Sequence, residues 1–419
     1  MRILMLAHRI PYPPHTGDKT RAFHIARHLA RRQDLTLAFL VDERADLAGL
    51  GPLREVIPDV EFARLWKPWS LLKGLAGLAA GGSLSLPYFH SLRLQRRIDR
   101  RLAGAPYDLV YASSTPMAEY ARGLGLPVVM DFVDVDSDKW RQYGDHGRPP
   151  LRWLYRVEGR RLQAAESEVA RWASVCLLAT HAEDRLLKSF APWARSAVIP
   201  NGIDLAYYEP IAALATQPVV LFTGAMDYLP NVDAVCHFCS DILPRVRREV
   251  PETRFYIVGL NPAPDVLRLA GIAGVTVTGS VPDVRPYYAR ASVCVAPLRI
   301  GRGIQNKVLQ GMAMGLPLVA SSLAARGLEA QPGRHLEVAD DPADFAARLV
   351  RLLKSSSDRR ALGRNGRAFV EANYGWERSL LNLEVVLAEV VRGDAGRPRR
   401  AGVAPTLVAG VAGQENGGS

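Results

Sequence analysis

The segment Val293–Ser321, VCVAPLRIGRGIQNKVLQGMAMGLPLVAS, decides the fold of this chain. It reads as an apolar strand, a Gly-rich loop with two arginines and a lysine, a helix, and a second apolar strand. A helix that opens out of such a loop points free backbone N–H groups at whatever precedes it, and its dipole favours an anion there. Arg299, Arg302 and Lys307 add full positive charge at the same place. The segment therefore predicts a βαβ unit with an anion site at its loop; an ordinary βαβ unit with an incidentally basic loop is the alternative.

Strand-like and helix-like runs alternate along the chain, which is typical of parallel sheets covered by helices on both faces. Thr180 and Glu183 form a Thr-x-x-Glu capping box, which predicts the start of a helix and gives both residues a structural role. We expect an α/β fold with two Rossmann-like, doubly wound domains that face each other across a cleft. The expected strands lie at 2–7, 35–41, 109–112, 128–131, 219–223, 254–258 and 275–278, and the clearest helices at 21–32, 158–172 and 232–249.

Length and composition bound the class of protein. A chain of 419 residues exceeds what one hydrophobic core usually serves, so two domains are expected. The hydrophobic content of 48% and the charged content of 23% are those of an ordinary globular protein and do not suggest extensive disorder. Cys236 and Cys239 form an isolated CxxC without a second ligand pair, which favours core thiols in a reducing compartment. Because the N-terminus lacks a secretory signal and no uncharged apolar run reaches about 18 residues, we expect a cytoplasmic protein without a spanning helix.

The net charge of +11 is concentrated in one region. Between Trp66 and Arg101, seven lysines and arginines face a single acid, Asp99. Tryptophans and leucines alternate with these charges, a pattern that fits an interfacial segment on an anionic membrane surface. A solvated basic helix face is the alternative. No helix-turn-helix, zinc-finger or RNP-like pattern accompanies the charge, so we expect no nucleic-acid partner.

Six motifs together resemble a known family. The chain is similar to retaining glycosyltransferases of the GT-B fold in the GT4 group, and within it to the sugar transferases of PEP-CTERM/exosortase-associated exopolysaccharide clusters. The resemblance implies sugar transfer from a nucleotide diphosphate sugar, without a metal or other cofactor and with retention at the anomeric carbon. The motifs are YPPHTGDKTRAFHIARHL near the start, DFVDVDSDKW at 131–140, IPNGID at 199–204, FTGAMDYLPNVDA at 222–234, VTGSVPDVRPYY at 277–288 and APLRIGRGIQNKVLQGMAMGLPLVAS at 296–321.

The resemblance also implies which residues bind the donor. A departing pyrophosphate develops negative charge, which positioned cations and N–H dipoles stabilise. Many relatives place an Arg and a Lys after the first strand of the second domain, but the loop at 224–231 reads GAMDYLPN here. We therefore assign this catalytic role to Lys307 and Arg302, with Arg299 in support. The expected donor contacts are Gly17, Asp18, Gly224, Arg299, Gly303, Ile304, Gln305, Asn306 and Gln310.

Three further positions depart from the family pattern. The usual pair of glutamates eight positions apart appears here as Arg302 and Gln310, so the contact to the donor ribose lacks a carboxylate. The His that many members carry after the strand at 128–130 is Asp131 here. We expect Asp131 and Asp134 to orient or deprotonate an acceptor hydroxyl. A cluster of carboxylates could instead bind Mg²⁺. Further acceptor contacts, which could equally be solvated, are Lys19 and Arg21.

The leading hypothesis is a cytoplasmic glycosyltransferase, peripheral on the inner face of the cell membrane, that extends a saccharide on a polyprenyl-type lipid during exopolysaccharide biosynthesis. A nucleotide-sugar 2-epimerase of the same fold and a catalytically weakened assembly subunit are the alternatives. The expected domains are an N-terminal acceptor domain at 1–206 and a C-terminal donor domain at 207–373. A helix at 374–392 is expected to pack back on the N-terminal domain, and 393–419 is expected to be a disordered tail.

Overall fold

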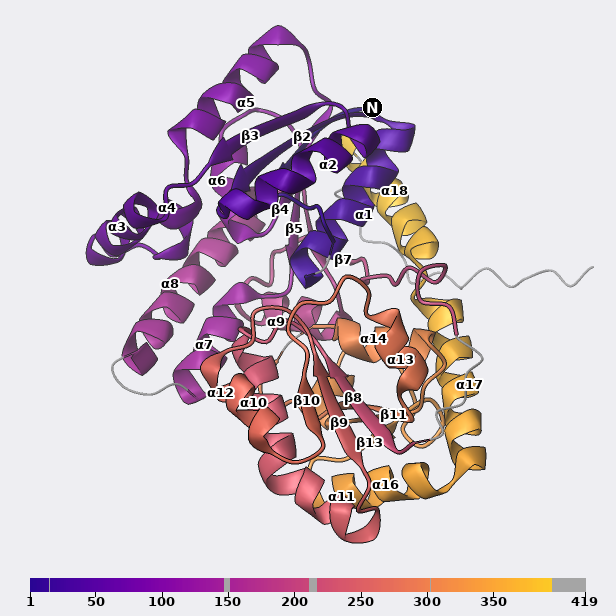
Figure 1. The fold of residues 1–419 in the computed structure, drawn as a ribbon. Coiled ribbons are helices and arrows are strands. Elements are labelled where there is room, and N and C mark those ends of the chain that lie inside the picture. The colour runs from indigo at the N-terminus through magenta and orange to yellow at the C-terminus, as the bar shows by residue number, and fades with distance from the viewer. Residues whose placement is uncertain (15, 147–150, 211–216, 302, 394–419) are drawn as a thin grey trace, which may run out of the picture.

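The structure is a computed structural model that describes residues 1–14, 16–146, 151–210, 217–301 and 303–393. The N-terminal half is built on a parallel sheet of seven strands in the order β3-β2-β1-β4-β5-β6-β7 (Figure 1). Along β1, Ile3 and Met5 lie in one buried cluster and Leu4 and Leu6 in another, so both faces of the sheet are covered. The strands are β1 (Arg2–Ala7), β2 (Asp34–Val41), β3 (Val60–Arg64), β4 (Leu109–Ser113), β5 (Val128–Val133), β6 (Val175–Leu178) and β7 (Ser196–Val198).

Helices cover both faces of this sheet and extend from one side of it (Figure 1). Short 3-10 turns at Arg44–Gly49 and Thr115–Met117 complete the connections. The helices are α1 (Gly17–Arg32), α2 (Leu50–Val56), α3 (Lys67–Ala79), α4 (Ser85–Phe89), α5 (Leu92–Gly104), α6 (Ala118–Ala121), α7 (Asp136–His146), α8 (Leu151–Trp172) and α9 (His181–Phe190).

The C-terminal half repeats this architecture with six parallel strands in the order β10-β9-β8-β11-β12-β13. The expectation of two doubly wound α/β units is thereby confirmed. The strands are β8 (Val219–Thr223), β9 (Arg254–Val258), β10 (Val275–Val277), β11 (Val293–Ala296), β12 (Leu318–Ala320) and β13 (Glu337–Val338). The helices are α10 (Leu229–His237), α11 (Leu243–Glu249), α12 (Pro264–Arg268), α13 (Arg285–Arg290), α14 (Asn306–Ala313), α15 (Ser322–Ala325), α16 (Pro342–Lys354), α17 (Ser356–Asn373) and α18 (Trp376–Val391), with a 3-10 turn at Leu269–Gly271.

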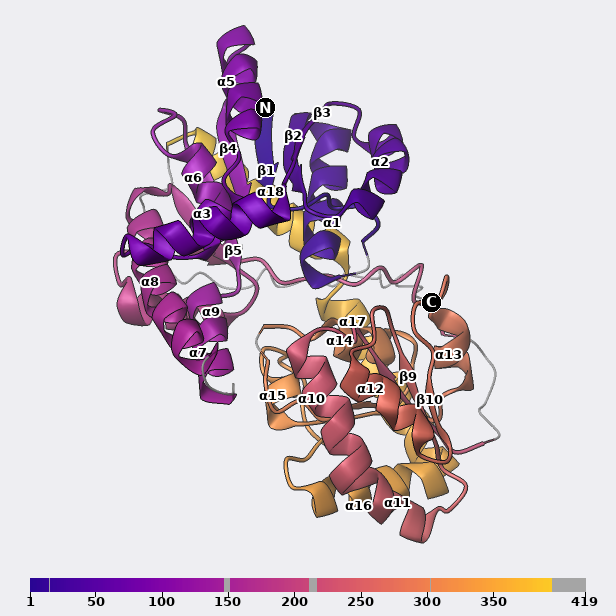
Figure 2. The ribbon, with the colours of Figure 1, turned by 60° about the vertical axis from the view of Figure 1, so that its left-hand side comes forward.

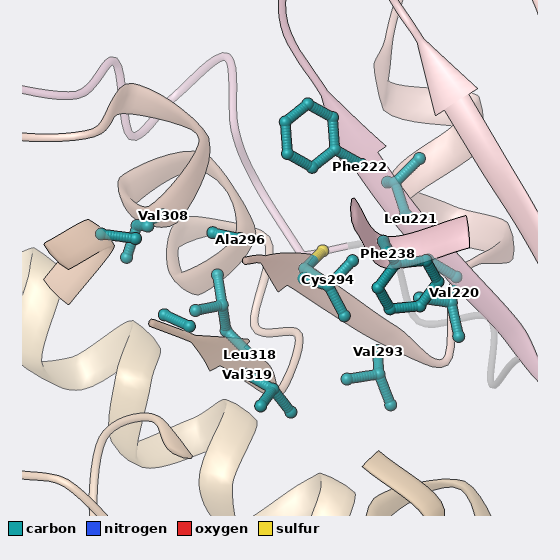
Figure 3. Close-up of a cluster of buried hydrophobic side chains, with 14 of the residues drawn as sticks. Val220, Leu221, Phe222, Phe238, Val293, Cys294, Ala296, Val308, Leu318 and Val319 are labelled. Atoms are coloured by element: carbon teal, nitrogen blue, oxygen red, sulfur yellow. The ribbon is translucent and has the colours of Figure 1, made fainter. Parts of the chain in front are cut away.

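The C-terminal core holds α14 close to the sheet. Val308 of α14 lies in one cluster with Cys294 of β11 and Leu318 of β12 (Figure 3). A β-carbon at Gly311 would lie 3.2 Å from Cys294 Sγ and 3.1 Å from Leu318 Cδ1, so a larger residue would fit only if these neighbours shifted by a few tenths of an ångström. Glycine in a helix costs about 1 kcal/mol relative to alanine. Here it permits the close approach that sets the position of the helix entrance.

The chain crosses between the two halves twice, and the two crossings lie side by side. The backbone N–H of Ile203 donates to the carbonyl of Tyr374 at 2.7 Å. Beyond this point α18 runs along the N-terminal half beside α1, and Figures 1 and 2 show it there in yellow. Trp376, Leu383 and Val390 belong to the same buried cluster as the strand residue Ile3. Residues 376–391 therefore complete the N-terminal core.

Two helices differ from their expected bounds. The helix expected at 21–32 begins at Gly17, so this expected donor contact is the first residue of a helix. The helix expected at 232–249 is interrupted by a π-helical turn at Phe238–Ile242. Pro244 lacks the N–H that would continue the α-helical ladder, which accounts for the break before α11. Apart from Gly393, the expected tail at 393–419 lies outside the described residues.

Candidate functional site

Two helix entrances face each other between the halves. Gly17 begins the 16-residue α1 after β1, and Asn306 begins α14 after β11. A β-carbon at Gly17 would lie 3.5 Å from Asn306 Nδ2, so the two loops approach closely. Both β1 and β11 are inner strands of their sheets, and both loops lie at the carboxyl ends of those strands. The free N–H groups and the dipoles of both helices therefore favour an anion at this place.

Lys307 supplies the cation at the α14 entrance. Its Nζ lies 3.3 Å from Gln305 Oε1 and 5.4 Å from the centroid of the Phe222 ring. Within the described ranges no carboxylate lies at ion-pair distance from this ammonium group. Burial without a counter-charge lowers the pKa of Lys307 to about 8. The side chain therefore presents a poorly solvated positive charge, which an anionic ligand would stabilise.

This lowered pKa predicts a pH dependence. The Lys307 ammonium charge is present below about pH 8 and is lost as the pH rises through the pKa. The affinity of this site for an anionic ligand is therefore expected to fall about tenfold per pH unit above this value. Arginine keeps its charge, so Lys307→Arg should remove the fall when binding is measured across this pH range. An alkaline fall that persists unchanged in the variant would contradict the assignment to Lys307.

The loop before α14 is held by carboxylates of the N-terminal half. Gly303 has φ +61°, and a β-carbon there would clash with the Asp134 carboxylate, so glycine is required. Glu183 accepts hydrogen bonds from the backbone N–H groups of Val135, at 2.8 Å, and Gly303. Burial and the charge of Asp134 raise the pKa of Glu183 to about 8. Arg302, assigned a catalytic role from the sequence, lies outside the described residues.

The expected capping box forms only in part. The Thr180 hydroxyl accepts from the backbone N–H of Glu183 at 3.1 Å and caps α9, as predicted. The Glu183 carboxylate turns to the loops around Val135 and Gly303, and its hydrogen bond with Gly303 links the two halves. Glu183 is therefore a cleft residue as well as a helix residue, a position that the Thr-x-x-Glu pattern does not reveal. It also lines a small pocket with Gln142, Thr180, Ala182, Gly301, Gly303, Leu323, Arg326 and Gly327.

The backbone that leads to Asp134 is strained. Val133 has φ +66°, a conformation that is rare for a β-branched residue. The register of β5 against β6 shifts at the same place, between Asp131 and Val133. The strain and the register shift place the backbone of Asp134 where its carboxylate meets the loop at Gly303.

Lys139 of α7 belongs to this site and was missed by the sequence reasoning, which considered only the acids of its motif. Its Nζ lies 4.0 Å from Asp136 Oδ1. Burial disfavours its charge, but the charges of Asp136, Asp18 and Asp134 outweigh burial and raise the pKa of Lys139. The N-terminal half therefore contributes a cation beside its acids. The presence of a lysine inside DSDKW was the available signal.

Arg21 and Asp131 form a buried ion pair, which corrects the roles expected for them. Both side chains are at most 1% exposed. Arg21 Nε and Nη2 donate to the two Asp131 oxygens at 2.8 and 2.9 Å, and the Tyr111 hydroxyl donates to Asp131 at 2.6 Å. Arg21 Nη1 donates to the Ile199 carbonyl and to Asn201 Oδ1. With these contacts satisfied inside the core, neither side chain is placed to contact an acceptor.

Two other expected contacts also have protein partners. Lys19 is buried, and its Nζ lies 3.0 Å from Asp46 Oδ2. Its ammonium group is therefore poorly placed to contact an acceptor. Asp18 accepts from the Thr16 hydroxyl at 2.7 Å and lies 3.3 Å from His8 Nε2. Burial opposes its ionisation, but the hydrogen bond and charge of His8 and the charge of Arg9 prevail and lower the pKa of Asp18.

Arg299 is paired with Asp233 of α10. Its Nε lies 3.0 Å from Asp233 Oδ2 on α10, and its side chain is 53% exposed. The supporting catalytic role expected for Arg299 is therefore not reflected in this structure, because the guanidinium is already paired with a carboxylate on a neighbouring helix. Of the cations expected at the loop, Lys307 is the one that the described residues place at the helix entrance.

Gln310 lies in a network of hydroxyl groups. Its Nε2 donates to the Tyr208 hydroxyl at 2.8 Å, and its Oε1 accepts from the Tyr288 hydroxyl at 3.1 Å. Tyr288 also exchanges a hydrogen bond with Thr223 at 2.8 Å. A neutral amide can both donate and accept, so it satisfies both tyrosines at once. Gln310 keeps one N–H and one oxygen lone pair with which it could still contact a donor hydroxyl.

The loop at Gly224 requires its glycine and contributes one free acceptor. Gly224 has φ +158°, and a β-carbon there would lie 2.6 Å from Asn231 Nδ2. A β-carbon at Gly259 would overlap the Gly224 carbonyl, so the ends of β8 and β9 touch. Asn231 Nδ2 donates to the Ala225 carbonyl at 2.8 Å. Its Oδ1 is buried and accepts no hydrogen bond within the described part of the chain.

No metal site emerges from the acidic residues. The described ranges contain no group of three or more His, Cys, Asp or Glu side chains arranged to hold a metal ion. In the same residues, no helix is both long and apolar enough to cross a bilayer.

Family models match both halves of the chain. Residues 16–202 match the glycosyl transferase 4-like domain, and residues 217–355 match the glycosyl transferases group 1 domain. The two matched segments meet at the site described above, since Gly17 belongs to the first and Asn306 to the second.

Curated relatives are distant. Spore coat protein SA of Bacillus subtilis is 24% identical over 46% of this chain and 59% of its own length. The phosphatidyl-myo-inositol mannosyltransferase of Propionibacterium freudenreichii is 28% identical over 47% of this chain and 51% of its own. The chain thus spans little more than half the length of these two relatives. The D-inositol 3-phosphate glycosyltransferase of Salinispora tropica is 25% identical over 91% of this chain and 83% of its own length.

Solved structures match the whole fold. Sucrose-phosphate synthase of Thermosynechococcus elongatus superposes with a TM-score of 0.70 at 17% identity, over 94% of this chain and 100% of its own. HepE of Anabaena in complex with UDP and glucose superposes with a TM-score of 0.65 at 15% identity, over 93% and 99%. At these identities the likeness establishes the fold, which is GT-B. With both domain models matched, the chain belongs to the glycosyltransferases of the GT4 type.

Proposed function

We propose that this protein is a retaining glycosyltransferase that moves a sugar from a nucleotide diphosphate sugar to a saccharide acceptor. The observation that carries the proposal is the meeting of two helix entrances, at Gly17 and Asn306, beside the Lys307 ammonium, which has no carboxylate partner among the described residues. This arrangement suits a diphosphate, because two sets of N–H groups and one full positive charge converge on it. The UDP and UDP-glucose bound by HepE, a protein of the same fold, support a nucleotide-sugar donor.

In the proposed reaction the bond between the anomeric carbon and the diphosphate breaks. The acceptor hydroxyl oxygen bonds to the same face of the sugar, and its proton passes to the departing diphosphate. Lys307 and the N–H groups at Ile304 to Asn306 stabilise the charge that develops on the diphosphate. Lys139 supplies positive charge from the opposite half, beside Asp134 and Asp136. Asp134, at the end of the strained segment, is the remaining candidate for orienting the acceptor hydroxyl.

The acceptor that we propose is a saccharide on a polyprenyl-type lipid in exopolysaccharide assembly, as in PEP-CTERM/exosortase-associated clusters. The motif resemblance and the basic, tryptophan-containing segment 66–101 support this proposal. The protein would act in the cytoplasm, at the inner face of the membrane.

The test of the function is incubation of the full chain with UDP- and GDP-sugars and polyprenyl-diphosphate-linked saccharides. Mass spectrometry of the lipid fraction should detect an acceptor extended by one sugar, and NMR should show the anomeric configuration of the donor retained. An epimerised donor without product would identify the epimerase alternative. Binding without either reaction would favour a weakened assembly subunit.

Turnover is expected to be independent of divalent metal. The cations at the proposed diphosphate site are lysine side chains, and the described residues hold no cluster of side chains arranged as metal ligands. Asp131 is also not available as a metal ligand, because both of its oxygens accept hydrogen bonds from Arg21. Treatment with EDTA followed by desalting should therefore leave the rate of sugar transfer unchanged. A loss of rate that Mg²⁺ or Mn²⁺ restores would show that the acidic residues bind a metal.

A further inference from the structure

Helix α3 presents its apolar side to solvent. Its small residues face the protein: a β-carbon at Gly74 would lie 2.9 Å from the Leu84 carbonyl, and one at Gly77 would lie 2.6 Å from Pro87 Cγ. A surface helix normally buries its large apolar residues and exposes its polar ones, so this orientation is reversed. The large apolar side chains exposed on and beside α3 are Trp66 (70%), Trp69 (56%), Leu71 (49%), Leu72 (58%) and Leu75 (46%).

The segment around α3 is cationic and contains no acid. No Asp or Glu occurs from residue 66 to residue 98, whereas five lysines and arginines do. Lys67 pairs with Glu43, and Arg97 pairs with Glu61. The remaining arginines at the start of α5, Arg93 and Arg96, are exposed and form no ion pair within the described residues. Exposed tryptophans and leucines thus lie in one chain segment with uncompensated positive charge.

The α3–α4 hairpin is anchored firmly from behind. Glu158 of α8 is buried and accepts from the backbone N–H groups of Leu84, at 2.6 Å, and Ser85, at 3.0 Å. Arg161 of α8 donates to the carbonyl of Gly82 at 2.9 Å and also to that of Leu78. Figure 1 shows α3 and α4 extending from the edge of the N-terminal half, away from the C-terminal half. The apolar face is therefore a fixed part of the fold.

We propose that α3 is a docking helix that inserts its apolar face into an anionic lipid surface. A lipid surface accommodates tryptophan and leucine at the headgroup level and attracts the flanking cations. A second copy of this chain is a poorer occupant, since two such segments would bring like charges together. The proposal rests on the membrane location proposed above and names the helix that would provide it. Its test requires neither donor nor acceptor, so lipid binding and sugar transfer can fail separately.

The test is flotation of the full chain with vesicles of phosphatidylcholine and phosphatidylglycerol in equal parts. The wild type should float with these vesicles, less so at high salt, and only weakly with phosphatidylcholine alone. Trp69→Glu/Leu72→Glu should lower binding at least about tenfold, because charged side chains then replace the inserting face. A matched control is Leu267→Glu/Leu381→Glu, which changes two leucines with exposures of 53% and 46% in the C-terminal half and on α18. The control should bind like the wild type.

Quenching by brominated lipid gives a second, independent reading. The protein fluorescence should be quenched when vesicles contain brominated phosphatidylcholine, and Trp66→Phe/Trp69→Phe should remove most of the quenching while keeping the apolar character of α3. Circular dichroism should show all variants folded, since the changed side chains are exposed. The proposal is overturned if the wild type does not float, if the α3 glutamate variant floats equally well, or if quenching persists without these tryptophans. It is also overturned if α3 instead mediates a dimer in solution that the glutamate variant abolishes.

Discussion

Replacement of Lys307 by alanine is expected to lower the turnover number for sugar transfer by about 100- to 1,000-fold, as for loss of one donor that stabilises developing charge. Lys307 is the cation that the described residues place at the α14 entrance, and no carboxylate in that part of the chain pairs with it. Without Lys307, only backbone N–H groups and more distant charges would stabilise the departing diphosphate. The measurement is a steady-state assay of product formation at saturating donor.

The matched control is Lys188→Ala on α9. Lys188 is partly exposed, and its Nζ lies 2.9 Å from Asp184 Oδ2. Both residues are far along the chain from the loop before α14. This variant should keep the wild-type rate. If Lys307→Ala also turned over at the wild-type rate while remaining folded, the assignment of Lys307 to leaving-group stabilisation would be wrong.

Replacement of Asp131 by alanine is expected to destabilise the N-terminal half by about 3–5 kcal/mol, as when one partner of a buried ion pair is removed. The Arg21 guanidinium would remain in the core with its main counter-charge gone, and the Tyr111 hydroxyl would lose its acceptor. Urea unfolding followed by circular dichroism should show a lower midpoint for the transition that reports this half.

Asp34→Ala provides the comparison for this stability effect. Asp34 pairs with Arg2 at 3.0 Å, but its side chain is 62% exposed, so its loss should cost at most about 1 kcal/mol. An Asp131→Ala midpoint as mild as that of Asp34→Ala would show that the Arg21–Asp131 pair contributes little to the core.

The alternation of strands and helices was enough to predict the architecture, because parallel strands buried on both faces are continuously apolar. The runs at 2–7 and 219–223 coincide with β1 and β8. The ends of the helices were harder to predict from the sequence. Gly17 has a low helix propensity, yet it opens α1, because the packing of the rest of the helix on the sheet outweighs that local preference. Asp18 lies in the first turn, where the helix dipole favours an acid.

Charge patterns in the sequence identified the positions at the cleft but not their partners. The helix entrance at Asn306 and the glycine at position 17 do approach each other. In contrast, Arg21 and Asp131 are 110 residues apart, and no local pattern indicates that they neutralise each other in the core. Lys139 was overlooked for the opposite reason, since its charge is surrounded in sequence by the more conspicuous acids at 134, 136 and 138.

The return of α18 to the N-terminal half has a consequence for biosynthesis. Ribosomes make residues 376–391 after the entire second sheet. The part of the N-terminal core that Trp376, Leu383 and Val390 cover therefore stays exposed until these residues have been made. During that interval a growing chain exposes apolar surface of the kind that aggregates or recruits chaperones. The half that is translated first is therefore the half that matures last.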